Sequence, residues 1–491
     1  MVRSILDALD RHAAERPGAR ALDDFTYADL RAASLQVAAR LRAAGVAAGD
    51  RVAIYAENRP GFALAYLGGL RAGAIVVPVN VLYRTSDLEH VLDDAAAAAV
   101  CVSEASAPFA ARAGRTLIDL HEIERIARDA NAPELADPPE PAADAVAILI
   151  YTSGTTGRSK GAMLTHGNLA AIGEQVVEAW RWTAADTLLL TLPLFHVHGL
   201  GAGLNGTLVA GGRAILRERF DAPTVLAILA GGEVSMFFGV PTMYVRLLAS
   251  AAPAARFDAM RLFVSGSAAL PAPVFEEFER RFGIAILERY GSTEFGFALS
   301  NRYDGPRYAG TVGFPLPHVD VRLADPQGND VAAGEAGEIL VHGPNVCAGY
   351  WNNPEASAAA FVRDAQDRRW YKSGDLATYD PQRGYTINGR LKELVISGGF
   401  NVYPIEVETE LLRLPGVLAA AVVGAPDPAR GEIPVAFLEV DGAFDADASL
   451  ATLRERLASF KVPKALYPVE ALPRNAMGKV EKPKLRTLLE R

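Results

Sequence analysis

Residues 151–161 read Tyr151-Thr152-Ser153-Gly154-Thr155-Thr156-Gly157-Arg158-Ser159-Lys160-Gly161, with three glycines, five Ser/Thr hydroxyls and two cations in eleven residues. A glycine-rich turn lets several backbone N–H groups point at one anion, while hydroxyls add donors and Lys or Arg adds charge. The apolar run Ala145 to Ile150 predicts a buried strand before the loop, and the amphipathic stretch after Thr165 predicts a helix behind it. We therefore expect a polyphosphate-binding loop at a strand end, where α/β proteins bind ligands.

The loop does not have the sequence of a P-loop NTPase. That class requires G-x-x-x-x-G-K-[ST], with the lysine directly after the second glycine. Here Lys160 follows Arg158 and Ser159 and precedes Gly161, so that motif is absent. A plain Gly/Thr surface turn stays open for the loop taken alone.

Composition narrows the class of protein. A chain of 491 residues, half of them apolar, is long enough for about two to four domains with a large core. The net charge of −9 argues against a nucleic-acid partner, which requires a basic surface. Cys101 and Cys347 are too few for a disulfide framework or a zinc site, so we expect a reducing cytoplasm.

No membrane segment is expected. The N-terminus lacks a continuous apolar signal core. The span Thr187 to Gly212 is free of charged residues and long enough for a membrane helix, but Pro193, two histidines, Asn205 and several glycines interrupt it. It predicts a strand, a loop and a packed helix that line a pocket.

Strand-like runs alternate with amphipathic helices over roughly the first 320 residues, which predicts parallel α/β sheets. The expected strands are Arg51 to Tyr55, Ala74 to Pro78, Ala99 to Val102, Thr187 to Leu192, Ala214 to Leu216, Met236 to Val240 and Leu262 to Ser265. Short alternating strands from His318 to Val341 predict a small β subdomain. Strands at Ala419 to Val423 and Val435 to Val440, with helices at Glu406 to Leu414 and Leu450 to Ala458, predict a compact α+β module.

The predicted fold class is therefore α/β. A large N-terminal domain, residues 1–389, contains two α/β subdomains and the small β subdomain. A small α+β C-terminal domain follows it, and the resemblance given below implies that residues 390–392 are a hinge and that residues 393–491 are mobile.

Six further segments occur in the order found in the adenylate-forming enzymes, the superfamily of acyl-CoA synthetases, luciferases and peptide-synthetase adenylation domains. They are Pro193-Leu194-Phe195-His196-Val197-His198-Gly199, Ser265-Gly266-Ser267-Ala268-Ala269-Leu270, Glu288-Arg289-Tyr290-Gly291-Ser292-Thr293-Glu294, Tyr371-Lys372-Ser373-Gly374-Asp375-Leu376, Gly389-Arg390-Leu391-Lys392-Glu393 and Pro473-Arg474-Asn475-Ala476-Met477-Gly478-Lys479. With the glycine-rich loop, they make the chain resemble an acyl-CoA synthetase over nearly its whole length.

The resemblance implies a two-step reaction with ATP, Mg²⁺ and CoA, in which a carboxylate attacks the α-phosphate and CoA thiol then attacks the acyl-adenylate. Glu294 resembles the acid that holds Mg²⁺, Thr293 the residue that touches the α-phosphate, and Asp375 the carboxylate that accepts both ribose hydroxyls. The implied nucleotide-binding residues are Thr152, Ser153, Gly154, Thr155, Thr156, Gly157, Lys160, Gly266, Ser267, Ala268, Glu288, Tyr290, Gly291, Asp375 and Arg390, with Tyr290 stacked on adenine.

The C-terminal segments imply a mobile catalytic group. Lys479 resembles the lysine that bridges the substrate carboxylate and the phosphate, within a frame that protein acetyltransferases recognise. Lys392 occupies the hinge position. Rotation about it would exchange Lys479 for the loop of Ser397, Gly398, Gly399 and Phe400, which would line the path of CoA.

Arg289 discriminates best among possible acids, because a buried guanidinium needs a partner and a second carboxylate fits it bidentately. Together with His198 near the acyl carboxylates, it resembles the malonyl-CoA synthetase branch. That branch usually has Met where Ser292 stands, so the smaller Ser predicts room for a substituted malonate. An internal salt bridge of Arg289 with Glu288 or Glu294 stays open, and the histidines could be core residues.

The sequence therefore predicts an AMP-forming acyl-CoA synthetase, with a short dicarboxylate such as malonate as the favoured substrate. Two enzyme alternatives are a ligase of short, medium or aromatic monocarboxylates and a free-standing adenylation domain. A non-catalytic nucleotide or acyl-adenylate sensor is a further alternative, although binding alone would not need the mobile lysine. The oligomeric state does not follow from the sequence.

Overall fold

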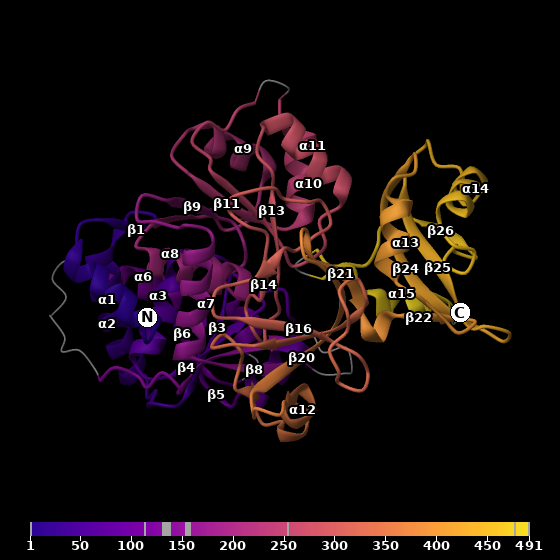
Figure 1. Cartoon of the computed structure of the whole chain (residues 1–491). Coiled ribbons are helices and arrows are strands. Elements are labelled where there is room, and N and C mark those ends of the chain that lie inside the picture. The colour runs from indigo at the N-terminus through magenta and orange to yellow at the C-terminus, as the bar shows by residue number, and fades with distance from the viewer. Residues whose placement is uncertain are drawn as a thin grey trace.

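A computed structural model describes residues 2–111, 114–129, 139–152, 159–252, 255–475 and 478–489. The chain up to about residue 390 forms one large body, and the remainder forms a smaller one beside it, coloured orange to yellow in Figure 1. Mixed α/β architecture with a large N-terminal and a small C-terminal domain confirms the predicted fold class.

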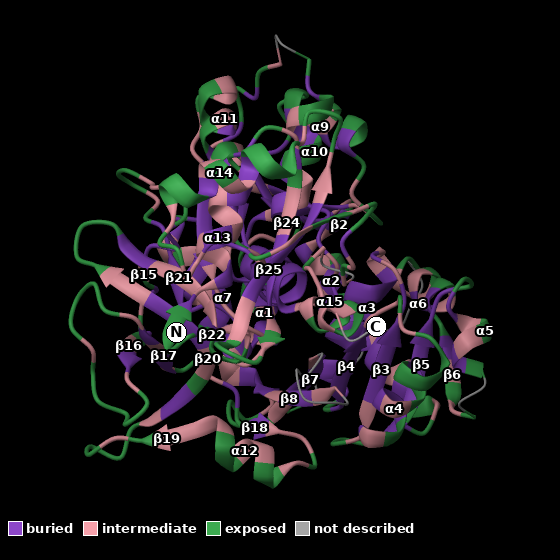
Figure 2. Cartoon of the chain, turned by 90° about the vertical axis from the view of Figure 1, so that its right-hand side faces the viewer, coloured by how far each residue is buried: buried purple, intermediate pink, exposed green. Residues whose placement is uncertain are grey.

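The first sheet of the N-terminal domain carries the flanks of the glycine-rich loop. Its strands run in the order β18-β8-β7-β4-β3-β5-β6, and the β7-β4-β3-β5-β6 part is parallel. Their bounds are β3 (Arg51–Tyr55), β4 (Ile75–Val79), β5 (Ala97–Val102), β6 (Thr116–Asp119), β7 (Val146–Thr152), β8 (Lys160–Thr165) and β18 (Gly349–Tyr350). Strands β3 and β4 are buried on both faces, as continuous apolar runs in parallel sheets require, and are purple in Figure 2.

The second sheet supplies the motif residues of the acyl side. Its order is β15-β14-β13-β12-β11-β9-β10-β1-β2, with a parallel centre from β13 to β1. The bounds are β1 (Arg20–Leu22), β2 (Phe25–Thr26), β9 (Thr187–Leu190), β10 (Arg213–Leu216), β11 (Met236–Gly239), β12 (Leu262–Ser265), β13 (Leu287–Tyr290), β14 (Leu299–Ser300) and β15 (Phe314–Pro315).

Helices cover the two large sheets of the N-terminal domain. They are α1 (Ile5–Glu15), α2 (Tyr27–Ala43), α3 (Pro60–Arg71), α4 (Thr85–Asp94), α5 (Ala107–Ala110), α6 (Leu120–Ala127), α7 (His166–Ala179), α8 (Gly206–Ala210), α9 (Ala222–Ala230), α10 (Pro241–Ser250) and α11 (Ala272–Phe282). Helix α7 begins where the sequence predicts, because Thr165 and Asn168 form a reciprocal cap.

The charge-free span Thr187 to Gly212 forms β9, a loop, the π-helical turn η2 (His198–Asn205) and α8. None of the helices in the described part of the chain is long and apolar enough to cross a membrane. Gly199 has no room for a side chain, since a Cβ would lie 2.2 Å from the carbonyl oxygen of Pro193. The glycines of this span therefore let the chain turn tightly behind the two histidines.

The β subdomain is larger than the sequence predicts. Its antiparallel sheet has the order β16-β17-β20-β19, with β21 also paired to β20. The elements are β16 (Asp320–Ala324), β17 (Gly337–His342), α12 (Pro354–Ala360), β19 (Phe361–Arg363), β20 (Arg369–Asp380) and β21 (Gly384–Arg390). The expected segment His318 to Val341 supplies β16 and nearly all of β17, while the other three strands come from later residues.

The C-terminal domain has cores of its own around Val422 and Val423. Its sheet has the order β23-β22-β25-β24, with β26 parallel to β25. The elements are β22 (Val395–Ser397), β23 (Phe400–Val402), α13 (Pro404–Leu411), β24 (Val417–Asp427), β25 (Gly431–Val440), α14 (Ala446–Arg456), β26 (Leu466–Val469) and α15 (Lys482–Leu489). The 3₁₀ turn η3 (Leu391–Glu393) precedes it and contains the proposed hinge residue Lys392.

Candidate active site

The glycine-rich loop connects two antiparallel strands. Ser153, Gly154, Thr155, Thr156 and Gly157 lie outside the described residues. Thr152 ends β7 and pairs with Lys160, which begins β8, so the two ends of the loop lie opposite each other.

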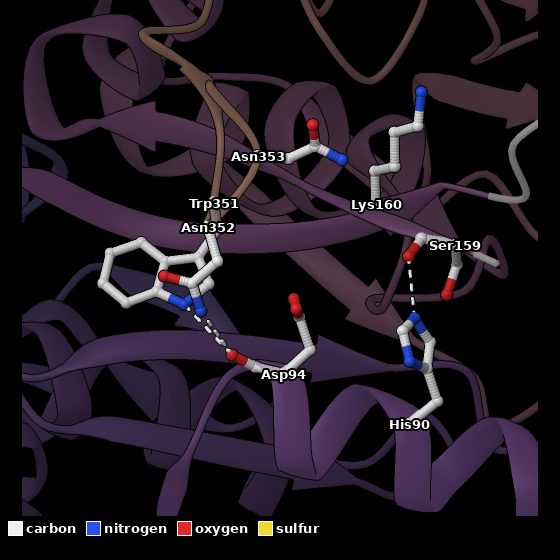
Figure 3. A pocket seen from close by; sticks show the side chains of 7 residues that line it. All are labelled: His90, Asp94, Ser159, Lys160, Trp351, Asn352 and Asn353. Atoms are coloured by element: carbon white, nitrogen blue, oxygen red, sulfur yellow. Dashed lines mark hydrogen bonds between the residues drawn. The ribbon is translucent and has the colours of Figure 1, made fainter. Parts of the chain in front are cut away.

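Helix α4 holds both flanks of this loop. His90 Nε2 lies 2.9 Å from the carbonyl oxygen of Ser159, and the Tyr151 hydroxyl donates to Asp94 Oδ2 at 2.6 Å. A cavity of about 270 Å³ lies beside these contacts, lined by His90, Asp94, Ser159, Lys160, Trp351, Asn352 and Asn353. Figure 3 shows the Lys160 side chain extending away from His90 and Asp94. Its Nζ lies 5.5 Å from the centre of the Tyr350 ring.

Asp375, Tyr290 and Arg390 form a second cluster. The Tyr290 hydroxyl donates to Asp375 Oδ2 at 2.7 Å, and Arg390 Nε lies 3.1 Å from Oδ1. Asp375 and Arg390 are paired across β20 and β21, so backbone register alone brings them together. Burial raises the pKa of Tyr290, followed by the effect of Asp375, so the phenol stays protonated and can donate.

Glu294 is fixed from both sides. The Ser292 hydroxyl donates to Oε2 at 2.8 Å, and the Tyr350 hydroxyl donates to Oε1 at 2.9 Å. The sequence places Ser292 beside the acyl group, whereas its hydroxyl bonds to the carboxylate expected to hold the metal. Gly291 allows a close approach here, since a Cβ would lie 2.0 Å from the carbonyl oxygen of Gly296.

This carboxylate suits Mg²⁺. No group of three or more His, Cys, Asp or Glu side chains among the described residues could hold a metal ion. Mg²⁺ does not need such a cage, because it binds through one or two carboxylates together with phosphate oxygens and water. Glu294 has one hydrogen bond on each oxygen, which leaves lone pairs on both for a cation.

Strand β13 separates the two charged residues of the Glu-Arg-Tyr-Gly motif, because successive side chains point to opposite faces. Glu288 accepts a hydrogen bond from the Leu270 backbone at 2.9 Å, and burial raises its pKa to about 8. Arg289 lies over the Phe297 ring at 4.4 Å and beside Gly266, whose Cβ would lie 2.4 Å from Arg289 Cζ.

Arg289 is 4% exposed, and its Nε and Nη2 have no hydrogen-bond partner among the described residues. Within that part of the chain it forms no ion pair with Glu288 or Glu294, so the internal salt bridge left open by the sequence is not seen. Burial lowers the pKa of Arg289 to about 9, still above neutrality, and the guanidinium stays charged.

Two histidines lie beside this guanidinium. His198 is fully buried, its Nδ1 lies 3.4 Å from Ser267 Oγ, and its Nε2 has no partner among the described residues. Burial lowers the pKa of both His196 and His198, and Arg289 lowers it further, so both rings are neutral at pH 7. Ser267 adopts the left-handed region at φ 69°, which is uncommon for a non-glycine residue and frequent at binding sites. Ala268, the next residue of that motif, is half-buried.

The C-terminal domain approaches the cluster of Asp375, Tyr290 and Arg390 through Lys479. Gly478 approaches Thr242 of α10, and Lys479 lies close enough to Arg390, Asp375 and Glu393 for charge interactions. Burial lowers the pKa of Lys479, and Arg390 lowers it further, although the residue keeps accessible surface.

The loop from Ser397 to Phe400, which was predicted to line the path of CoA, forms a hairpin in the C-terminal domain. Gly398 and Gly399 have φ values of 60° and 85°, as a two-residue hairpin turn between β22 and β23 requires. Ser397 is buried in that domain, and Phe400 is 57% exposed and stacked on Phe460.

Sequence reasoning missed several residues that build the site. Tyr350 and Asn345 approach the Glu294–Phe297 segment, with Asn345 Nδ2 donating to the carbonyl oxygens of Phe295 and Phe297 at 2.6 and 2.9 Å. Lys482 pairs with Glu393 and Glu408 at 3.3 and 2.7 Å, which connects the start of α15 to η3 and to α13. The polar and aromatic residues of the segment Asn345 to Asn353 are the sequence signal that could have pointed to Tyr350 and Asn345.

Two family models match this chain. Residues 9–351 match the model described as AMP-binding enzyme, and residues 406–479 match the AMP-binding enzyme C-terminal domain. The chain belongs to the AMP-binding enzyme family. It is an AMP-forming acyl-CoA synthetase, an enzyme that uses ATP, Mg²⁺ and CoA.

Relatives of this AMP-binding enzyme differ in the acid that they are named for. Feruloyl-CoA synthase of an Amycolatopsis species is 40% identical over 479 residues, covering 96% of this chain and 95% of the relative. The mitochondrial malonate–CoA ligase of Mus musculus is 35% identical over 508 residues, covering 94% of this chain and 86% of the relative. The crystal structure of ATP-bound MatB from Rhodopseudomonas palustris has a TM-score of 0.92 and 39% identity, covering 99% of both chains. The resemblance to the malonyl-CoA synthetase branch is thus confirmed, while the acid is still to be assigned.

Proposed function

We propose that this acyl-CoA synthetase ligates CoA to a short acid with a second carboxylate, such as malonate or a substituted malonate. The observation that carries the proposal is the buried Arg289, whose Nε and Nη2 have no partner among the described residues. An unpaired buried charge costs several kcal/mol, and a carboxylate presented to the planar fork removes much of that cost.

His198 extends the same argument. Its neutral ring lies beside Arg289 and keeps an unpartnered Nε2 within the described part of the site. We propose that it orients an acyl carboxylate by one hydrogen bond. The smaller Ser292 leaves the metal side of the pocket less crowded than a Met would, which supports a substituent on the acid.

For adenylation, we propose that the described residues act mainly by positioning and by neutralising charge. Asp375 accepts the ribose hydroxyls, Thr293 contacts the α-phosphate, and Lys479 bridges that phosphate and the attacking carboxylate. A Mg²⁺ ion held by Glu294 would neutralise charge on the phosphate oxygens as pyrophosphate leaves.

For thioester formation, we propose rotation about Lys392 in η3. It withdraws Lys479 and brings the hairpin of Ser397 to Phe400 to the path of CoA. The exposed aromatic ring of Phe400 supports this role, because it has surface to bury on closure. We propose residues 1–389 as the N-terminal domain, residues 390–392 as the hinge and residues 393–491 as the C-terminal domain. A protein acetyltransferase that acts on Lys479 is a candidate partner. The cytoplasm is the proposed compartment, since Cys101 and Cys347 are both buried free thiols.

A second candidate is a ligase of aromatic monocarboxylates, favoured by the 40% identity to feruloyl-CoA synthase. The deciding experiment measures AMP and pyrophosphate release, with and without CoA, for malonate, methylmalonate, butyrate and ferulate. Higher kcat/KM for the two dicarboxylates supports the proposal, whereas a preference for ferulate overturns it. Release of ADP would reject the adenylate mechanism.

A further inference from the structure

The carboxylate of Glu294 belongs to a hydrogen-bonded chain that also contains the hydroxyls of Tyr350 and Tyr371. Tyr350 donates its hydroxyl to Glu294 Oε1 at 2.9 Å and lies 3.1 Å from the Tyr371 hydroxyl. Ser292 donates to the other oxygen, Oε2, at 2.8 Å. The backbone of Glu294 is anchored too, since its carbonyl accepts from the Cys347 N–H at 2.7 Å.

Separate strands bring these hydroxyls together. Tyr350 lies in β18 and pairs with Ala162 of β8, the strand that begins at Lys160. Tyr371 is buried in β20, the strand that also carries Asp375. Tyr350 therefore lies between the return strand of the phosphate-binding loop and the strand that carries the ribose-binding carboxylate.

A glutamate needs such support to hold a cation in a fixed direction. Its last torsion is broad, so a carboxylate with one free oxygen rotates easily. Donors on both oxygens fix that rotation and still leave lone pairs for a metal. A phenol is protonated at neutral pH, so the Tyr350 hydroxyl can donate to Glu294.

We propose that Tyr350 is a positioning residue that orients Glu294 for a divalent cation, with the Tyr371 hydroxyl as its support. The inference deepens the proposed function, because it rests on the metal role of Glu294. It does not depend on which acid is the substrate.

The test uses the full-length protein and titration calorimetry. Affinity for α,β-methylene-ATP is measured with excess Mg²⁺ and with EDTA, and the ratio of the two dissociation constants gives the metal coupling. Affinity for AMP without metal reports whether the nucleotide pocket is intact. The variants are Tyr350→Phe and Tyr371→Phe, and the matched control is Tyr379→Phe, which removes another phenol from β20.

We expect Tyr350→Phe to reduce the metal coupling by about 10-fold, in the range seen for outer-shell ligand partners, with AMP affinity within about a factor of two of the parent. Tyr371→Phe should reduce it less, since Tyr350 keeps its bond to Glu294, and Tyr379→Phe should leave it unchanged. Metal coupling in Tyr350→Phe equal to the parent's would overturn the proposal.

Three further outcomes are informative. Equal loss of metal coupling and AMP affinity would also reject the proposal, because Tyr350 would then support the pocket as a whole. A parent protein without any metal coupling would reject both this inference and the metal role of Glu294. A parent with metal coupling but no activity on dicarboxylates would reject only the proposed substrate.

Discussion

Replacing Arg289 by methionine tests the substrate assignment most directly, because methionine fills similar space without charge. In the parent, Arg289 is 4% exposed, lies 4.4 Å from the centre of the Phe297 ring and has two nitrogens without a partner among the described residues. Truncating one side of a buried, hydrogen-bonded charge pair costs about 2–5 kcal/mol. We therefore expect kcat/KM for malonate to fall by roughly 30-fold to 5000-fold.

The comparison acid is 3-methylbutanoate, which has the shape of malonate but an isopropyl group in place of the second carboxylate. It leaves the guanidinium unpaired in the parent, so its kcat/KM should stay the same or rise in Arg289→Met. Arg289→Lys keeps the charge without the planar fork and should recover only part of the loss for malonate. Steady-state pyrophosphate release measures all of these rates. Equal losses for malonate and 3-methylbutanoate would refute the reasoning and make Arg289 a structural residue.

Three other expectations follow from the site and the fold. Lys392→Pro should fix φ within η3 and impair one of the two half-reactions selectively. The two rates to measure are adenylate formation from acid and ATP and thioester formation from supplied acyl-AMP and CoA. Parental rates in both half-reactions would exclude rotation at this residue. Lys479→Ala, or acetylated Lys479, should lose adenylation by several orders of magnitude yet keep thioester formation from acyl-AMP, and overall synthesis within about threefold of the parent would contradict this. His166 is 3% exposed and burial lowers its pKa to about 4, so unfolding releases a histidine that binds a proton below pH 6.5 and stability falls as pH decreases. His166→Leu should reduce the loss of unfolding free energy between pH 6.5 and 5 by about 2 kcal/mol in denaturant titrations, and an unchanged pH dependence would show that His166 is already protonated when folded.

Strands with continuous apolar runs were predictable from the sequence, because burial on both faces leaves an unbroken pattern. Leu262 to Ser265 is the same as β12, and Arg51 to Tyr55 is the same as β3. The predicted strand Thr187 to Leu192 ends two residues early, because the Leu192 carbonyl accepts from Asn58 Nδ2 instead of pairing in the sheet. That side-chain contact spans 134 residues and leaves no local signal.

Hairpin arms that extend past their core were harder to predict. Strands β24 and β25 pair as far as Asp427 and Gly431, although the apolar runs stop earlier. Helix α14 begins at Ala446, before the predicted start at Leu450, because Asp445 caps it by accepting from the Ala448 N–H. Polar ends of elements are set by caps and backbone pairing, which hydrophobic periodicity does not report.

In the candidate site, too, some contacts were predictable from the sequence and others were not. Asp375, Arg390 and Lys479 are brought together as the motifs predict, although their roles stay predictions. Tyr350 was missed, since it reaches Glu294 through a two-residue strand with no periodicity of its own. The family resemblance implied a place for Ser292 beside the acyl group, which stays a prediction, but it gave no sign that the Ser292 hydroxyl donates to a carboxylate two residues away.

Each of the two large sheets contains strands that are far apart in the sequence, and this affects how the protein folds while the ribosome makes it. Strands β1 and β2, residues 20–26, belong to a sheet whose other strands come from residues 187–315, while β18 at residues 349–350 completes the edge of a sheet that begins at residue 51. Neither sheet can close while the ribosome has made only the first half of the protein. At about 5–20 residues per second, β8 waits roughly ten seconds or more with an open edge, a feature that invites pairing with other chains. Nascent chains arrested before residue 349 should therefore bind chaperones or aggregate, and release of only a few more residues should suffice to protect that edge.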